Sequence, residues 1–192
     1  MFQHVKPYLE STDITFANSE SIVGGQGIGL SDYPLFNSPF EVGNTLKDVG
    51  IDVVSMANNH TLDRGEVAII NATNHWNNLG ITYVGVATSQ EEAEQIKTLT
   101  ANGISFAFLA YTYGTNGLFP PEGKGYLVNY LDEEKLISDI QKAKELADVV
   151  VLSLHIGNEY EREISNEQDK IAQLAADYGA HIIFAHHPHV LH

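Results

Sequence analysis

Imidazole and other metal-binding side chains gather most densely near the end of this sequence. The segment HIIFAHHPHV (181–190) contains His187 and His189 on either side of Pro188. Neutral imidazole, amide oxygen and carboxylate are ligands for borderline divalent ions such as Mn²⁺, Zn²⁺ or iron, and they suit Ca²⁺ and Mg²⁺ less well. If the backbone around Pro188 is extended, both rings face the same side. The pattern therefore predicts two ligands of a divalent-metal site.

Three earlier apolar segments also run into side chains of this kind. These side chains are Glu20, Asn59, His60 and His155. In open α/β sheets, ligands bind beyond the carboxyl ends of the strands, so we expect all four segments to converge on one site. Two ions about 3.5–4 Å apart would activate a water molecule and bind the oxygens of a phosphoryl group.

Asn59 and His60 have a chemical and a structural interpretation. The amide oxygen of Asn59 is able to ligate a metal, while His60, without ligating, donates a proton to a leaving oxygen. Alternatively, Asn58 and Asn59 form an Asx turn and His60 caps the next helix. Asp63 either orients the His60 ring or forms the N-cap of that helix, and the two roles do not exclude each other.

The remaining candidates carry weaker signals. His155 is either a ligand or a hydrogen-bonded core histidine, and Glu20 is either a ligand or a solvated carboxylate. His186 is a candidate to support the ligands from behind. The substrate-binding candidates are Tyr111, Tyr113, Asn116 and Glu159. The two tyrosines are equally suited to packing. The histidines without a partner pattern, which we assign to the surface or to packing, are His4, His75 and His181.

Strand and helix patterns alternate along the chain. Short runs rich in Val, Ile and Phe predict buried strands at 13–17, 52–57, 81–86, 104–113, 148–154 and 181–185. Helical spacing and end signals predict helices at 41–50, 64–79, 89–99, 132–147 and 165–179. Gly- and Pro-rich loops occupy 21–40 and 114–126. This alternation predicts an α/β fold with a mostly parallel sheet covered by helices.

Composition limits the possible functions. A chain of 192 residues with 43% apolar content predicts one domain over 1–192. Because the sequence has no cysteine, any metal is held by His, Asn and carboxylate. The formal charge of −15, from 10 basic and 25 acidic residues, excludes nucleic acid as a partner and means that a polyanionic substrate needs a metal or a local basic group. The absence of a bilayer-length apolar run or signal-peptide pattern predicts a soluble chain.

Five motifs occur in an order that resembles a known family. They are ANSE (17–20), ANNHTLDRG (57–65), AYTYGTNG (110–117), HIGNEY (155–160) and HHPHV (186–190). In this order they resemble the CapA family of capsule and poly-γ-glutamate biosynthesis proteins, which is similar in turn to the calcineurin-like metallophosphoesterases. The resemblance implies a metallophosphoesterase-like α/β/β/α sandwich, truncated at both ends, with a dinuclear metal site.

The resemblance also implies roles for individual residues. The implied ligands are Asn59, His155, His187 and His189, and Glu20 falls near the place of an acidic bridging ligand. His60 would be the proton donor. The aspartate-bearing first strand of the metallophosphoesterases would precede this sequence, and Ala185 stands where CapA proteins have Gly.

Two hypotheses of function follow. The first is a metal-dependent hydrolase of a phosphate or related ester, with a small phosphate-containing substrate. The second is a non-catalytic accessory protein at the cell surface that assists synthesis or export of an anionic γ-glutamyl polymer, with membrane-bound polymer synthase components as partners. The sequence leaves the choice between enzyme and accessory protein open.

Overall fold

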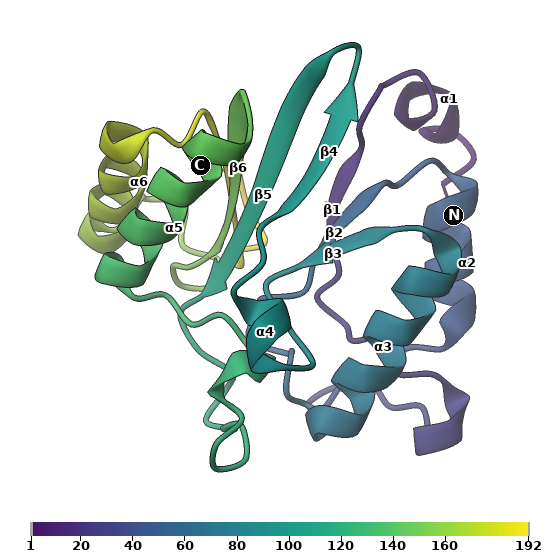
Figure 1. The fold of residues 1–192 in the computed structure, drawn as a ribbon. Helices are drawn as coiled ribbons and strands as arrows, with labels where there is room; N and C mark the ends of the chain where they lie inside the picture. Colours follow the sequence, from purple (N-terminus) through teal and green to yellow (C-terminus); the bar gives the residue numbers. More distant parts are fainter. Residues whose placement is uncertain (1, 192) are drawn as a thin grey trace.

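Two separate sheets form the centre of the computed structural model, which describes residues 2–191 (Figure 1). The first sheet is parallel and has the order β1-β2-β3, with strands Phe16–Asn18, Val53–Ser55 and Thr82–Val84. The second has the order β4-β5-β6-β7, with strands Lys97–Ala101, Ile104–Thr112, Val149–His155 and Ile182–His186. Only β4 runs antiparallel to its neighbour. The α/β class is confirmed, whereas the single sheet expected from the alternating pattern is replaced by two.

Helices cover the outer face of each sheet. Helices α2 (Phe40–Asp48) and α3 (Gly65–Leu79) lie on one side of the molecule in Figure 1, and α5 (Glu133–Leu146) and α6 (Asn166–Tyr178) lie on the other, with the strands between them. The remaining elements are short: α1 (Lys6–Leu9), η1 (Gln26–Ile28), α4 (Gln90–Ala93) and η2 (Gly125–Leu127). In the described part of the chain, no helix has the length and apolar character needed to cross a membrane.

Side chains that alternate along the strands join these layers. In β2, Val53 belongs to a cluster between the two sheets, whereas Val54 packs with Trp76 of α3. In β5, Phe108 faces the first sheet and Leu109 faces the cluster with α5 and α6. Because successive strand residues point to opposite faces, the order of layers is helices, sheet, sheet, helices.

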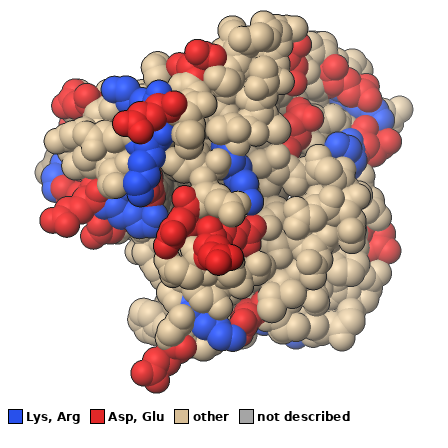
Figure 2. Space-filling model, in the orientation of Figure 1, with Lys and Arg blue, Asp and Glu red and all other residues tan. Residues whose placement is uncertain are grey.

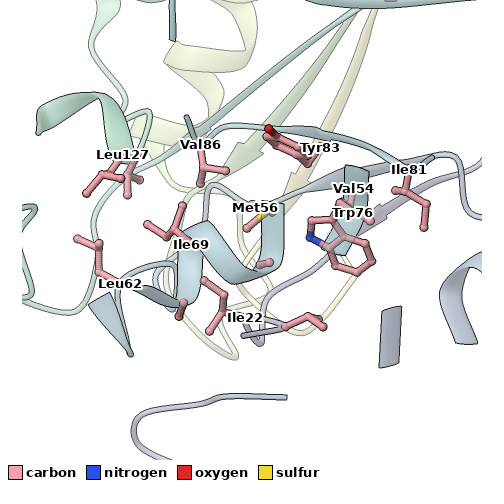
Figure 3. Close-up of a cluster of buried hydrophobic side chains, with 14 of the residues drawn as sticks. Ile22, Val54, Met56, Leu62, Ile69, Trp76, Ile81, Tyr83, Val86 and Leu127 are labelled. Carbon is pink, nitrogen blue, oxygen red and sulfur yellow. The ribbon is translucent and has the colours of Figure 1, made fainter. Parts of the chain in front are cut away.

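The cluster around α3 is the largest of the three buried groups. It surrounds the fully buried ring of Trp76 and is shown in Figure 3. Burial of each large apolar side chain contributes about 1.5–3 kcal/mol, so this cluster fixes α3 and the segment before it against the first sheet. That segment contains Asn59 and His60.

Most predicted helices are confirmed together with their end signals. Ser165 and Gln168 form a capping box at the start of α6, and the Asp132 side chain accepts a hydrogen bond from the Lys135 N–H at the start of α5. Gly80 and Gly179 end α3 and α6 in the left-handed conformation.

The helix predicted at 89–99 is wrong beyond its first turn. Ser89 does cap a helix by accepting from the Glu92 N–H, but α4 ends at Ala93 and β4 begins at Lys97. Residues 97–101 read KTLTA, in which β-branched residues alternate along a strand. Asn102 and Gly103, with φ of 51° and 81°, turn the chain tightly into β5. This hairpin signal overrides the local helical propensity.

Candidate metal centre

The carboxyl ends of four strands from both sheets meet at one end of the molecule. Strands β1 and β2 deliver Glu20 and Asn59, and β6 and β7 deliver His155 and the histidines that follow Ala185. His155 Nε2 lies 2.9 Å from Asn59 Oδ1 and 3.8 Å from Glu20 Oε1. The expected convergence of the four segments is therefore present.

Glu20, His155 and His187 form what we call the inner group. One donor atom from each lies within 4.8 Å of the others. His155 is fully buried and His187 is 6% exposed. Buried His187 Nδ1 has no hydrogen-bond partner within residues 2–191. Since buried polar atoms are normally paired, this arrangement of nitrogen and oxygen atoms fits a bound cation.

Glu159, His187 and His189 form the outer group, whose donor atoms also lie within 4.8 Å of one another. Glu159 and His189 are exposed. His187 belongs to both groups, and Glu20 Oε1 lies 3.6 Å from His189 Nε2. The two groups are therefore contiguous, as two neighbouring cation sites need to be.

The backbone around Pro188 differs from the extended form expected from the sequence. His187 and His189 have φ of 110° and 58°. Such values are uncommon for residues other than glycine, cost about 1–3 kcal/mol each and occur often at functional sites. The Tyr160 N–H donates to the Pro188 carbonyl over 2.7 Å. This hydrogen bond joins the loops after β6 and β7 and places Glu159 near His187 and His189.

Burial keeps His155, His186 and His187 neutral. It lowers the pKa of His155 to about 2, with further contributions from His186 and His187. Burial and the neighbouring His187 lower the pKa of His186 to about 4, and burial also lowers the pKa of His187. Burial raises the pKa of Glu20, although nearby His189 and His60 oppose the shift. Neutral imidazole is the form that ligates metals.

Asp63 orients the ring of His60. Asp63 Oδ2 lies 2.7 Å from His60 Nδ1 and accepts the Phe36 N–H over 2.7 Å. The N-cap position of α3 is Arg64, so Asp63 is not the helix cap that the sequence left possible. The Asx turn is present, since the Asn58 side chain accepts from the His60 N–H. The contact with Asp63 occupies Nδ1, so Nε2 is the ring nitrogen through which His60 would transfer a proton.

Three of the four substrate-binding candidates lie at the site. The Tyr113 ring is 4.9 Å from that of His187 between centroids, and the Asn59 amide donates to Asn116 Oδ1 over 3.4 Å. Glu159 belongs to the outer group. Tyr111 corrects our expectation: it is fully buried, and its hydroxyl donates to Asp139 of α5 over 2.8 Å. The alternation along β5 turns Tyr111 towards the helices and away from the site.

A cavity of about 660 Å³ opens beside the inner group. It lies between α6 and the end of β7, and it combines site residues with apolar side chains. Its lining includes Glu20, His187, His189, Leu154, Ile164 and Ala172.

Two residues that contact the site were not indicated by the sequence. Asn18 donates to Glu20 Oε2 over 3.0 Å, and Ser153 contacts His186. Neither carries a recognisable sequence signal. His186 lies behind His155, since its Nδ1 is 3.0 Å from His155 Nδ1. The three histidines expected at the surface or in packing lie outside the site. His4 is exposed, His75 contacts the Phe40 carbonyl, and His181 accepts a hydrogen bond from the Val150 N–H.

Comparison with known proteins gives a family and its relatives. The profile of the family described as "Bacterial capsule synthesis protein PGA_cap" matches residues 1–192. The "Capsule biosynthesis protein CapA" of Bacillus anthracis is 30% identical over 201 residues, covering 100% of this chain and 48% of the relative. The "PGA biosynthesis protein CapA" of Bacillus subtilis (strain 168) is 31% identical over 194 residues, covering 100% of this chain and 51% of the relative. The chain thus spans about half the length of these relatives.

Proposed function

Because this chain belongs to the bacterial capsule synthesis family PGA_cap, we propose that it takes part in the synthesis or export of an anionic γ-glutamyl capsule polymer. The resemblance to CapA proteins seen in the sequence is thereby confirmed at the level of the family. The cell surface as its location, and membrane-bound polymer synthase components as its partners, belong to the proposal.

The proposal gives the inner and outer groups the role of a centre for two divalent ions, Mn²⁺, Zn²⁺ or iron. The inner ligands would be Glu20, Asn59, His155 and His187, and the outer ones His187, His189 and Glu159, with Glu20 between the two groups. This assignment is supported by the neutral state of His155 and by His187 Nδ1, which has no hydrogen-bond partner among the described residues. Ions bound there would supply Lewis-acid activation of a water molecule and neutralise charge on phosphate oxygens.

The proposed reaction is hydrolysis of a phosphate or related ester, and His60 serves as its general acid. Asp63 Oδ2 contacts His60 Nδ1 and orients the ring, and His60 donates its Nε2 proton to the leaving oxygen. Tyr113 and Asn116 orient the substrate at the rim of the site. The order of helices, sheet, sheet and helices supports, as part of the same proposal, a metallophosphoesterase-like sandwich.

The negative charge of the molecule is consistent with a need for bound cations when the substrate is an anion. The formal charge is −15, and Figure 2 shows acidic side chains at many places on the face in view, with Lys and Arg interleaved over α5 and α6. An anionic substrate approaches such a surface against electrostatic repulsion. Bound cations would reverse the local sign at the site.

The observation that carries the proposal is the meeting of Glu20, His155 and His187 at the carboxyl ends of strands from both sheets. The test uses the full chain, stripped of metal and titrated with Mn²⁺ or Zn²⁺ by calorimetry, and then assayed with an aryl phosphate. We expect binding of metal and metal-dependent hydrolysis.

The variant His60→Asn separates catalysis from binding of the metal. It should bind metal as the parent does and lose about 10²–10⁴-fold in rate, whereas the control His75→Asn should lose nothing. A chain that binds no metal, or hydrolysis that is insensitive to His60, would contradict the proposal. Binding of the γ-glutamyl polymer that survives His187→Ala would then favour the non-catalytic accessory role.

A further inference from the structure

A chain of hydrogen bonds runs from Ser153 through two histidines to Asn59. Ser153 Oγ lies 2.7 Å from His186 Nε2, His186 Nδ1 lies 3.0 Å from His155 Nδ1, and His155 Nε2 lies 2.9 Å from Asn59 Oδ1. The register of β6 and β7 sets His155 directly beside His186. Ser153, His155 and Asn59 are all at least 98% buried.

The acceptor at the end of the chain fixes its direction in the metal-free protein. The Asn59 amide nitrogen donates to Asn116, so Asn59 Oδ1 faces His155 Nε2 and needs an N–H there. A neutral imidazole carries one N–H. His155 Nδ1 therefore accepts from His186 Nδ1–H, and His186 Nε2 accepts from the Ser153 hydroxyl.

A cation bound at His155 Nε2 requires the opposite direction, because a ligating nitrogen offers its lone pair and carries no proton. His155 then holds its proton on Nδ1 and donates to His186 Nδ1, while His186 Nε2–H donates to Ser153 Oγ. The Nε2 proton of His155 passes to water, and the hydroxyl of Ser153 regains a proton from water. The exchange therefore releases no net proton.

We propose that Ser153 and His186 form a reversible hydrogen-bond relay that accommodates both tautomers of His155 and so lets the inner group take up a divalent cation while the rings of His155 and His186 stay neutral. His186 is thus a positioning residue. The metal-bound state of the relay rests on the proposed function, whereas its metal-free state stands on these contacts alone. Partners behind a ligating histidine commonly change metal affinity by about 10–100-fold.

The relay is tested by nitrogen NMR of the full chain with ¹⁵N-labelled histidine, first without metal and then with Zn²⁺. Without metal, we expect the proton of His155 on Nε2 and that of His186 on Nδ1. Saturation with Zn²⁺ should move both protons to the opposite nitrogen. A His155 proton already on Nδ1 without metal, or an unchanged His186 tautomer at saturation, would overturn the relay.

Variants separate this positioning role from a structural one. In protein shown to be folded by circular dichroism, His186→Phe should weaken Zn²⁺ binding by about 10–100-fold. His186→Gln, whose amide is able to accept or donate, should recover most of the lost Zn²⁺ affinity. Ser153→Ala should lower the Zn²⁺ affinity less than His186→Phe does. The control His75→Phe, at a histidine outside the site, should bind Zn²⁺ as the parent does.

The outcomes distinguish the relay from the metal site itself. Parental Zn²⁺ affinity in folded His186→Phe would overturn the relay and leave the proposed function standing. If the parent binds no Zn²⁺, the proposed function fails, and the nitrogen NMR spectra of the metal-free protein then test the relay alone. Protons on His155 Nε2 and His186 Nδ1 support the metal-free state of the relay, and a proton on His155 Nδ1 or on His186 Nε2 overturns it.

Discussion

The inner and outer groups share His187 and differ in how the chain holds them. The inner group is built at the ends of regular strands, has two buried histidines and is supported from behind by His186 and Asn18. The outer group lies on two loops, has exposed members and depends on a strained backbone at His187 and His189. Under the proposed function, this difference predicts a tightly held inner ion and a more exchangeable outer one.

The largest effect expected is loss of the inner ion in His155→Ala. Removal of a buried ligand should weaken binding at least about a hundredfold, beyond the usual effect of a supporting residue. At a metal concentration 100 times the Kd, the parent gains about 2.7 kcal/mol, which raises Tm by about 5–11 °C in a chain of this size. His155→Ala should lose this gain in thermal melts with and without Zn²⁺. An undiminished gain would remove His155 from the ligand set.

Acid should destabilise the metal-free protein through His155 and His186. Their pKa values are about 2 for His155 and about 4 for His186 in the native state, against about 6.5 when unfolded. Below pH 6.5 only the unfolded chain takes up these protons, so the free energy of unfolding falls by about 1.4 kcal/mol per pH unit for each ring. The fall stops near pH 4 for His186 and near pH 2 for His155.

Urea unfolding of the metal-free protein between pH 7 and pH 5 measures this effect. His186→Gln removes one of the two rings, so its stability should fall less steeply with acid than that of the parent. Equal slopes in the two proteins would show that the pKa of His186 is not lowered in the native state, against the effect of burial described for this residue.

An intermediate effect is expected for His189→Ala, which removes a ligand of the outer group only. Metal analysis after desalting should show one bound ion per chain in place of two. The affinity of the remaining ion should stay close to that of the parent. If this variant loses both ions, the two groups form one indivisible site and the contrast between them is wrong.

The smallest effect is expected for Glu159→Gln. The carboxylate is exposed, and interactions of exposed charges are worth about 0.2–1 kcal/mol, so the outer ion should bind only about two- to fivefold more weakly. Calorimetric titration in low salt measures this change, and Glu163→Gln, an exposed acid outside both groups, is the matched control. A loss as large as that of His155→Ala would place Glu159 among the principal ligands.

Local patterns in the sequence sufficed for most elements of the fold. The Val-, Ile- and Phe-rich strands and the capped helices are dictated by burial and by end signals, and six predicted strands occur close to their expected positions. The division into two sheets depends on long-range pairing that no local pattern encodes. Strand β4 was missed because the capping signal at Ser89 is real but extends over one turn only.

The sequence identified the residue types of the site better than their arrangement. Strand ends predicted where Glu20, His155 and His187 would meet, since parallel strands present their carboxyl ends at one edge. Tyr111 was misplaced because it lies within β5, where it packs towards the helices, whereas Tyr113 follows the end of β5 and lies at the rim. The contact of His186 with His155 required the register of β6 and β7, which appears only in three dimensions.

The central claim is that the inner group binds a divalent cation, and anomalous X-ray scattering tests it most directly. Crystals of the full chain grown with Zn²⁺ should show an anomalous peak between Glu20, Asn59, His155 and His187, and the peak should be absent in His155→Ala. Peaks confined to the molecular surface, with none between these four residues, would contradict the account.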